Sequence, residues 1–311
     1  MEILALELLF VVLWSSGFTG AKYGLPYAGS FTLLFIRYVL VATLLFVWLS
    51  YRGELRLHSR AAIARCALIG LLAHAVWLSA VFGAIALGIS PWIVALITAL
   101  QPMATSVLSG PLLGEQVSPI QWAGMVVGLV GVVVVVGTKA SIQIDVPWIG
   151  YGLPFISTLS MTLATLYQRH INRRQPGVAL PVLSSLFVQA VTSAIALYPL
   201  ALFFEDLQVQ WTRQFAFALA WLVMVLSIGA YGLMFKLLEY RTAARVSSLA
   251  YLSPPVTLGF GFLVFGDVLG IGGVLGLGIT AVGVALVYRG DVNKADRQAS
   301  NRFNNLRGMM P

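Results

Sequence analysis

One arginine stands in the middle of a long apolar stretch. Arg37 lies inside residues 29–50, among aliphatic and aromatic neighbours. At the rise of an α-helix it would lie about 13 Å from the end of a membrane-spanning segment. A charge at that depth costs about 2.5 kcal/mol or more, and such residues commonly serve function. Three roles stay open: a guanidinium that binds an anion or carboxylate, one that holds helices together through backbone carbonyls, or one that snorkels to the membrane surface.

Aromatic and imidazole side chains recur near the middle of other apolar stretches. His74 and Trp77 share one helical face; His74 could bind a carboxylate or take up a proton, or it could simply bond to a neighbouring helix. Trp14 lies away from the interfaces where tryptophans collect, which favours a cavity wall. Tyr231 belongs to a stripe that suits an adaptable cavity or plain packing, together with Met224, Ser227 and Met234.

Hydroxyl groups and prolines give further candidates. Residues 148–169 are rich in Ser and Thr, with Ser157 and Ser160 adjoining a threonine face, and these groups either join helices or line a polar path. Pro102 and Pro254 lie mid-stretch and should kink their helices as paired gates. The expected substrate site therefore comprises Trp14, Arg37, His74, Trp77, Ser157, Ser160, Tyr231 and Tyr251.

Composition decides the class of protein that carries these residues. Of 311 residues, 59% are hydrophobic and 10% charged, whereas soluble domains carry about 25% charged residues. The chain is therefore expected to be an all-α, multi-pass membrane protein. Its net charge of +8 comes from loops and the tail, so nucleic acid is not an expected partner. No catalytic pair or cluster of metal ligands is evident, and neither an enzyme, a metal nor a cofactor is expected.

Ten stretches are long and apolar enough to cross a bilayer. They are residues 3–21, 29–50, 63–87, 91–110, 117–137, 148–169, 179–204, 215–239, 244–265 and 270–288. Basic residues gather in alternate loops and in the tail, and on the other side would lie only Lys22, Lys139 and Arg213. The positive-inside rule then predicts that both termini are cytoplasmic.

The sequence also repeats itself. A shift of 152 residues places Leu34 on Leu186, Pro102 on Pro254 and Gly124 on Gly276. A repeat of five spans is odd-numbered, so its two copies should cross the membrane in opposite directions, as in many secondary transporters. We expect repeats at 1–145 and 146–290, followed by a disordered basic tail at 291–311. Glycines in the fifth and tenth spans should let these two helices pair, as a scaffold or as the face of a weak homodimer.

The residues resemble the EamA-type, ten-span branch of the drug/metabolite transporter superfamily. The matching positions are Trp14 to Phe18, Lys22, Pro26, Arg37, Gln101-Pro102, Gly114-Glu115, Gln121, Gly124 and Gly131, with a second set at Ser253-Pro254, Gly266-Asp267, Gly276 and Gly283. Within that branch the chain looks most like the YddG-type bacterial exporters. The resemblance implies export of amino acids or related small metabolites across the inner membrane. Two positions depart from the pattern: Asp267 stands where Glu is usual, and Gln189 stands where the repeat would place a second Arg37.

Several alternatives stay open. A phosphate ester, a nucleotide sugar or a drug could be the substrate, although the phosphate-bearing solutes generally need clusters of Lys and Arg. An intramembrane enzyme or a receptor fits poorly, because the acids lie mostly in loops and no large soluble segment exists. Both proton-coupled transport and uniport agree with the sequence.

Overall fold

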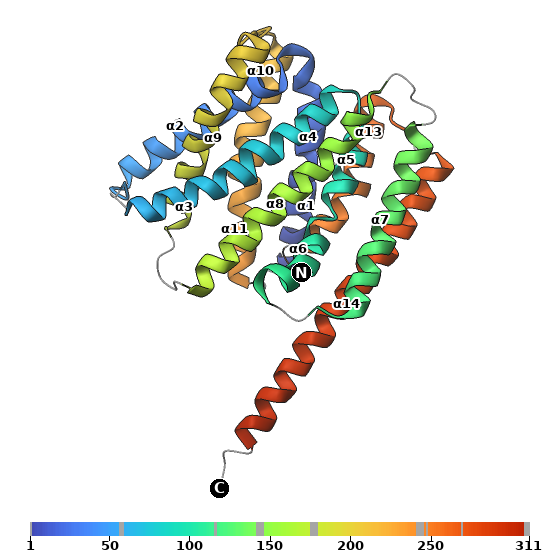
Figure 1. Cartoon of the computed structure of the whole chain (residues 1–311). Coiled ribbons are helices and arrows are strands. Elements are labelled where there is room, and N and C mark those ends of the chain that lie inside the picture. Colours follow the sequence, from blue (N-terminus) through green and yellow to red (C-terminus); the bar gives the residue numbers. More distant parts are fainter. Residues whose placement is uncertain are drawn as a thin grey trace. The chain divides into compact units, whose positions relative to one another are not determined.

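The computed structural model describes residues 2–55, 59–114, 117–140, 146–174, 180–240, 246, 248–268 and 270–307. Within these ranges the regular secondary structure is helical (Figure 1). Nine helices in this part of the chain are long and apolar enough to cross a membrane, and a shorter apolar helix covers Leu249–Phe265. Helices dominate because a bilayer offers no partners for backbone polar groups, which must therefore bond within the segment.

The principal elements follow the expected stretches in order. They are α1 (Glu2–Gly24), α2 (Ser30–Tyr51), α3 (Arg60–Gly70), η2 (Leu71–Val76), α4 (Trp77–Ala86), α5 (Pro91–Thr98), α6 (Gln101–Leu113), α7 (Pro119–Ala140), α8 (Trp148–Arg174), α9 (Val182–Glu205), α10 (Arg213–Ala220), η3 (Trp221–Ala230), α11 (Tyr231–Tyr240), η4 (Leu249–Leu252), α13 (Ser253–Phe265) and α14 (Ile271–Arg307).

Two kinds of irregularity interrupt the spans. The segments η2 and η3 are π-helical and continue directly into the α-helices on either side. At the prolines the helices break: Pro102 lies in the first turn of α6, and Pro254 in the first turn of α13, directly after the 3₁₀ segment η4. Proline suits a first turn because its missing N–H has no partner there in any case. The kinks that the sequence predicts are thus interruptions of the helix.

The chain forms two compact units. One comprises residues 1–99 and 143–268, and the other residues 100–142 and 269–311. Each unit takes segments from both halves of the sequence, so packing does not follow the expected boundary at residue 145.

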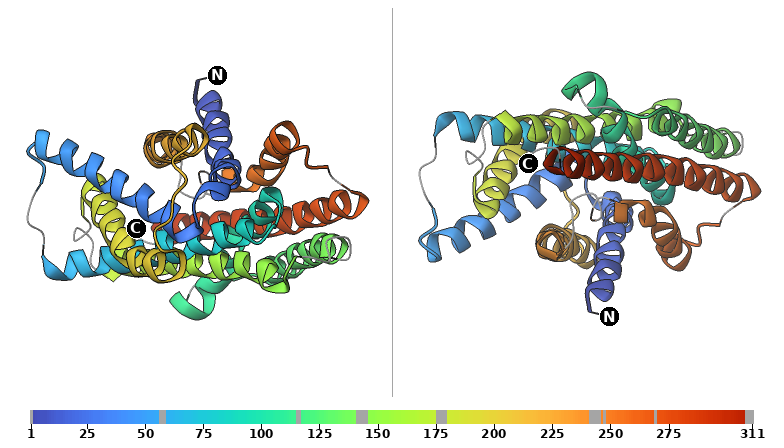
Figure 2. Two further views of the ribbon diagram at one scale, coloured as in Figure 1. Left: turned by 90° about the horizontal axis from the view of Figure 1, so that it is seen from above. Right: turned by 90° about the horizontal axis from the view of Figure 1, so that it is seen from below.

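In the first unit, α2 and α9 pack against each other along their length (Figure 2). The ring of Phe35 lies 5.4 Å from that of Tyr198, and the ring of Phe46 lies 6.1 Å from that of Phe187. A higher number on α2 thus meets a lower number on α9, so the helices are antiparallel. The shift of 152 residues converts Phe35 into Phe187 and Phe46 into Tyr198. The sequence repeat therefore converts each of these two ring contacts into the other.

The second unit repeats this relation in α7 and α14, which lie side by side in Figure 1. A Cβ atom built on Gly124 would lie 2.7 Å from the carbonyl oxygen of Gly283, and one built on Gly131 equally close to that of Gly276. These backbones touch because glycine has no side chain, which confirms the predicted pairing of the two helices. The shift of 152 residues exchanges these contacts too.

Helix α14 continues to Arg307, well beyond the last predicted span. Residues 291–307 contain neither proline nor glycine, so the sequence offers no residue that would end the helix.

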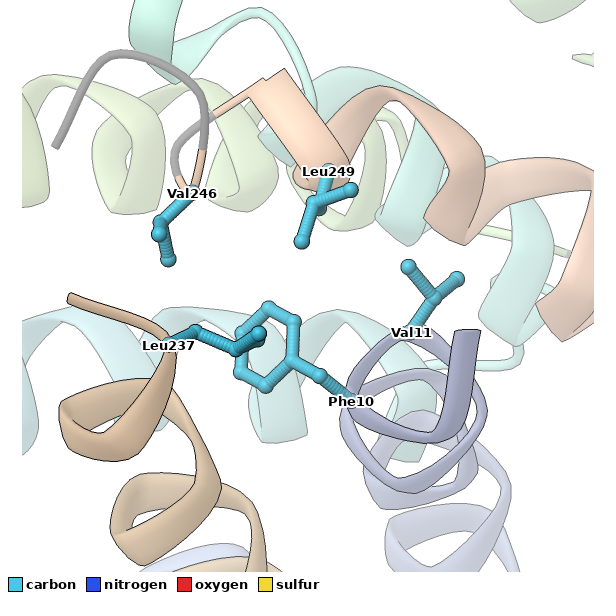
Figure 3. Close-up of a cluster of buried hydrophobic side chains, with 5 residues drawn as sticks. All are labelled: Phe10, Val11, Leu237, Val246 and Leu249. Carbon is cyan, nitrogen blue, oxygen red and sulfur yellow. The ribbon is translucent and has the colours of Figure 1, made fainter. Parts of the chain in front are cut away.

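An apolar cluster packs the N-terminal half of α1 in the first unit. Phe10 and Val11 of α1 meet Leu237 of α11, together with Val246 and Leu249 (Figure 3). These five side chains close the space between α1, α11 and η4.

Candidate functional site

Arg37 is buried on α2, with 2% of its surface exposed. Its Nε and Nη2 donate to the hydroxyl of Ser227 in η3, at 3.1 and 3.0 Å. That hydroxyl donates in turn to the carbonyl oxygen of Leu222 at 3.1 Å. The remaining nitrogen, Nη1, is buried and has no hydrogen-bond partner in the part of the chain that the structure describes. A permanent charge with an unused donor is a strong recognition group for an anion.

Arg37 lies on the wall of two cavities, and Tyr231 shares both walls with it. The smaller cavity is an aromatic slot whose volume of about 20 Å³ has room for roughly one water molecule. Trp14 stacks on Trp77 with ring centroids 6.0 Å apart, and it meets Tyr231 edge-on at 5.6 Å. In this conformation the three rings fill the space that a substrate body would need.

The larger cavity has a volume of about 170 Å³ and holds most of the polar groups. Tyr38, His74 and Ser227 join Arg37 and Tyr231 on its wall. The rest of the lining is glycine and aliphatic: Val41, Leu45, Leu183, Leu186, Ala190, Ile228 and Gly232. The cavity thus joins a small polar region to an apolar body, as substrate sites for small organic molecules commonly do.

His74 lies in η2 and is buried, with Nε2 placed 2.9 Å from Oε1 of Gln189. Its ring also lies against those of Tyr38 and Tyr231, at centroid distances of 5.5 and 5.8 Å. Its other nitrogen, Nδ1, has no partner among the described residues. The contact with Gln189 is the helix-linking role that the sequence left open, and the free nitrogen leaves room for a further role.

The two π-helical segments occupy equivalent places in the repeat. A shift of 152 residues carries η2 onto residues 223–228, inside η3. Arg37 binds η3, whereas Gln189, its equivalent, binds η2. Short π segments occur frequently at functional sites.

The π segments also correct one predicted pattern. At α-helical spacing, Met224 should share the face of Ser227 and Tyr231, yet it is 54% exposed and lines neither cavity. The wider turn of a π-helix rotates it away. Glu7, near the start of α1, is 2% exposed, because α1 packs against its neighbours already at this level.

Three predicted site residues do not line either cavity. Ser160 donates to the carbonyl oxygen of Leu72 at 2.8 Å, which joins α8 to η2. Ser157 is fully buried and its hydroxyl has no partner among the described residues. Tyr251 lies in η4. Their contacts with substrate stay predictions, as does the role of Pro102 and Pro254 as gates.

The C-terminal end of α1 is tied to the end of α13. Lys22 forms an ion pair with Asp267 at 3.1 Å and lies over the ring of Phe265, 4.1 Å from its centroid. Deeper in the unit, Ser15 donates to the hydroxyl of Ser253 at 3.0 Å. The ion pair and the hydroxyl contact, together the polar seam, thus hold α1 against α13 at two levels.

Among the described residues that line the two cavities, Arg37 carries the formal charge, since none of the others is Asp, Glu or Lys. Asp267 is engaged by Lys22. Glu205 accepts hydrogen bonds from the backbone N–H groups of Phe31 and Thr32, at 3.0 and 2.7 Å. Nor does the described part of the chain contain a group of three His, Cys, Asp or Glu residues placed to hold a metal ion. Arg37 is therefore the one permanently charged side chain on the described walls of the two cavities.

One solved crystal structure is similar in fold, with a TM-score of 0.63 at 17% sequence identity. The match covers 92% of this chain and 96% of the other chain. No curated protein sequence matches. Residues 1–137 and 148–289 match the EamA-like transporter family, whose members are membrane transporters and not enzymes. This match extends over both halves of the sequence, and the chain therefore belongs to the EamA-like transporter family.

Proposed function

We propose that this transporter exports amino acids, or related small metabolites with a carboxylate, from the cytoplasm across the bacterial inner membrane. The observation that carries the proposal is Nη1 of Arg37, a buried donor without a partner among the described residues, in a side chain that lines both cavities. A buried charge without a counter-charge is costly. A substrate carboxylate supplies both the opposite charge and the missing acceptor.

The reciprocal helix contacts support transport by alternating access. Both α2–α9 and α7–α14 run antiparallel and exchange their contacts under the shift of 152 residues. Such contacts are expected of two five-helix repeats with opposite orientation, related by a two-fold axis in the membrane plane. With the shorter helix Leu249–Phe265 as a span, the count becomes ten. Because the glycines of α7 and α14 face each other, they support the scaffold role, and a monomer is the simplest assembly.

The charge pattern supports cytoplasmic termini. In that orientation a cysteine placed at Gln208, after α9, should react with a membrane-impermeant thiol reagent in intact cells, with Cys66 replaced beforehand. A cysteine at Ser59, before α3, should react only after the membrane is opened. The opposite pattern would place both termini outside the cytoplasm and reject the proposed orientation.

The single cationic side chain favours a carboxylate over the alternative substrates. A nucleotide sugar or phosphate ester carries two or more negative charges near each other, and Arg37 is the one Lys or Arg among the described residues of the cavity walls. A cationic drug would meet Arg37 as a like charge.

The proposal can be tested by reconstituting the full-length protein in liposomes. Radiolabelled phenylalanine, leucine, a hexose phosphate and a cationic drug would be compared, with and without a pH gradient and against protein-free liposomes. We expect saturable movement of the amino acids. Movement of the phosphate ester or the drug alone would reject the proposal.

A further inference from the structure

Two buried polar atoms, Nη1 of Arg37 and Nδ1 of His74, have no partner among the described residues, and both belong to side chains that line the larger cavity. We propose that they recognise adjacent groups of one substrate. Arg37 binds its carboxylate, and Nδ1 of His74 accepts a hydrogen bond from an amino or hydroxyl group on the neighbouring carbon. The substrate class is then 2-amino and 2-hydroxy acids with an apolar side chain. This inference rests on the proposed function and narrows it.

The hydrogen bonds of Gln189 determine which ring nitrogen of His74 carries the hydrogen. The amide nitrogen of Gln189 donates to the hydroxyl of Ser185 at 2.9 Å, which directs Oε1 toward the imidazole. A carbonyl oxygen only accepts, so Nε2 of His74 must donate to it. In the uncharged ring Nδ1 then bears a lone pair. The uncharged form is expected, because a second buried cation beside Arg37 would find no acid on the cavity wall.

The two side chains that carry these atoms share one neighbour, Tyr38. The ring of Tyr38 neighbours both side chains: the guanidinium carbon of Arg37 lies 5.6 Å from its centroid, and the His74 ring 5.5 Å. All three residues line the same cavity of about 170 Å³. In an α-amino or α-hydroxy acid, the donor is attached to the carbon that bears the carboxylate. The remaining lining is largely aliphatic and accommodates the side chain.

Other readings of these residues leave an atom unexplained. A purely helix-linking His74 accounts for Nε2 and leaves Nδ1 buried and unpaired, which is unfavourable. An acidic residue could bind an ammonium instead, yet none lines the cavity. Glu7, on α1, is seven residues from Trp14, about 10 Å along the helix. A substrate donor that binds Nδ1 of His74 therefore accounts for this unpaired nitrogen without any further residue.

The test compares four acids that share one body. L-Phenylalanine and L-phenyllactate carry a donor beside the carboxylate, whereas phenylpyruvate and 3-phenylpropionate do not. Calorimetry on the purified full-length protein should give dissociation constants about tenfold lower for the first pair. His74→Phe should abolish this preference and keep carboxylate binding. Gln189→Met should weaken the preference in the same way, since it no longer fixes the hydrogen on Nε2. The matched control is His170→Phe on α8, which lines neither cavity and should preserve the preference.

The outcomes separate this inference from the proposed function. Equal affinity for the four acids, or tighter binding of the two without a donor, overturns the role of His74 and leaves carboxylate transport intact. A His74→Phe protein that loses affinity for all four equally does the same. Binding of phenethylamine with none of the four acids would reject the proposed function itself. The comparison of acids on the unmodified protein gives a decision even where a variant fails to fold.

Discussion

Replacing Arg37 by glutamine removes a buried charge and installs the residue that Gln189 already provides in the second repeat. The change removes the hydrogen bonds of Nε and Nη2 to the hydroxyl of Ser227, of 3.1 and 3.0 Å; both go to one oxygen, so we count them as one interaction of a charged group, worth about 1.5–3 kcal/mol. It also removes the cost of placing an arginine mid-membrane, about 2.5–3.5 kcal/mol. The two effects nearly cancel. We expect the free energy of unfolding to change by no more than about 1–2 kcal/mol, a shift of only a few degrees.

Arg37→Gln should change the transport rate far more than it changes stability. Losing a charge-assisted bond to a substrate carboxylate should lower transport of that substrate about 10- to 150-fold. Arg37→Lys should retain part of the rate, because it keeps the charge without the planar fork of donors. The decarboxylated amine of the same substrate has no carboxylate to lose, so any residual transport of it should not decrease.

The assay measures melting temperature in detergent beside initial rates for phenylalanine and phenethylamine in liposomes. Arg52→Gln is the matched control, since Arg52 is exposed after α2 and pairs with Glu54. A large fall in melting temperature, with equal loss of both solutes, would show that Arg37 holds helices together and does not bind substrate. In that case the mechanism built on its free nitrogen is wrong.

Three further changes test the scaffold, the seam and the helix break. Gly276→Ala should lower the free energy of unfolding by about 1–3 kcal/mol, because the new Cβ would overlap the facing backbone. The control Gly278→Ala, whose Cβ would have nothing within 4 Å, should leave it unchanged or raise it slightly. Chemical denaturation measures both. Asp267→Asn should cost less than about 1 kcal/mol, since its pair with Lys22 is partly exposed. If the pair holds α1 to α13 during transport, the variant should alter the transport rate and exchanging the two charges should restore it; an unrestored rate would show that the pair has no such role. Pro254→Leu should let α-helix extend back through η4 and slow transport per milligram of folded protein, and an unchanged rate would make the break a static feature.

Much of the scaffold follows from the sequence because its causes are local. The span positions depend on apolar length, and the observed helices begin and end close to the predicted stretches. The pairing of α7 with α14 was predictable because glycine is the residue that permits backbone contact. The burial of Arg37 followed from its position within one span. Each of these properties can be read from residue type and spacing.

The polar partners could not be read in the same way. Hydropathy carries no information on helical pitch, so the π segments that place His74 and Ser227 were not predicted. The wider pitch turned Met224 away from a face that α-helical spacing had assigned to it. The partner of Arg37 depends on how α2 meets η3, which is a tertiary relation between residues 190 positions apart. Such contacts need coordinates.

The site is not symmetric under the sequence repeat. Arg37 and Gln189 are equivalent in the repeat, and each reaches the π segment of the other half. Their partners differ as well, since the shift of 152 residues places His74 on Leu226 and Ser227 on Ala75. A second arginine at position 189 would add a buried charge that repels the first, whereas Gln189 is able to orient His74. In the transport mechanism proposed above, the charge lies on one side of the two-fold axis, and we expect the substrate carboxylate to bind on that side in both conformations.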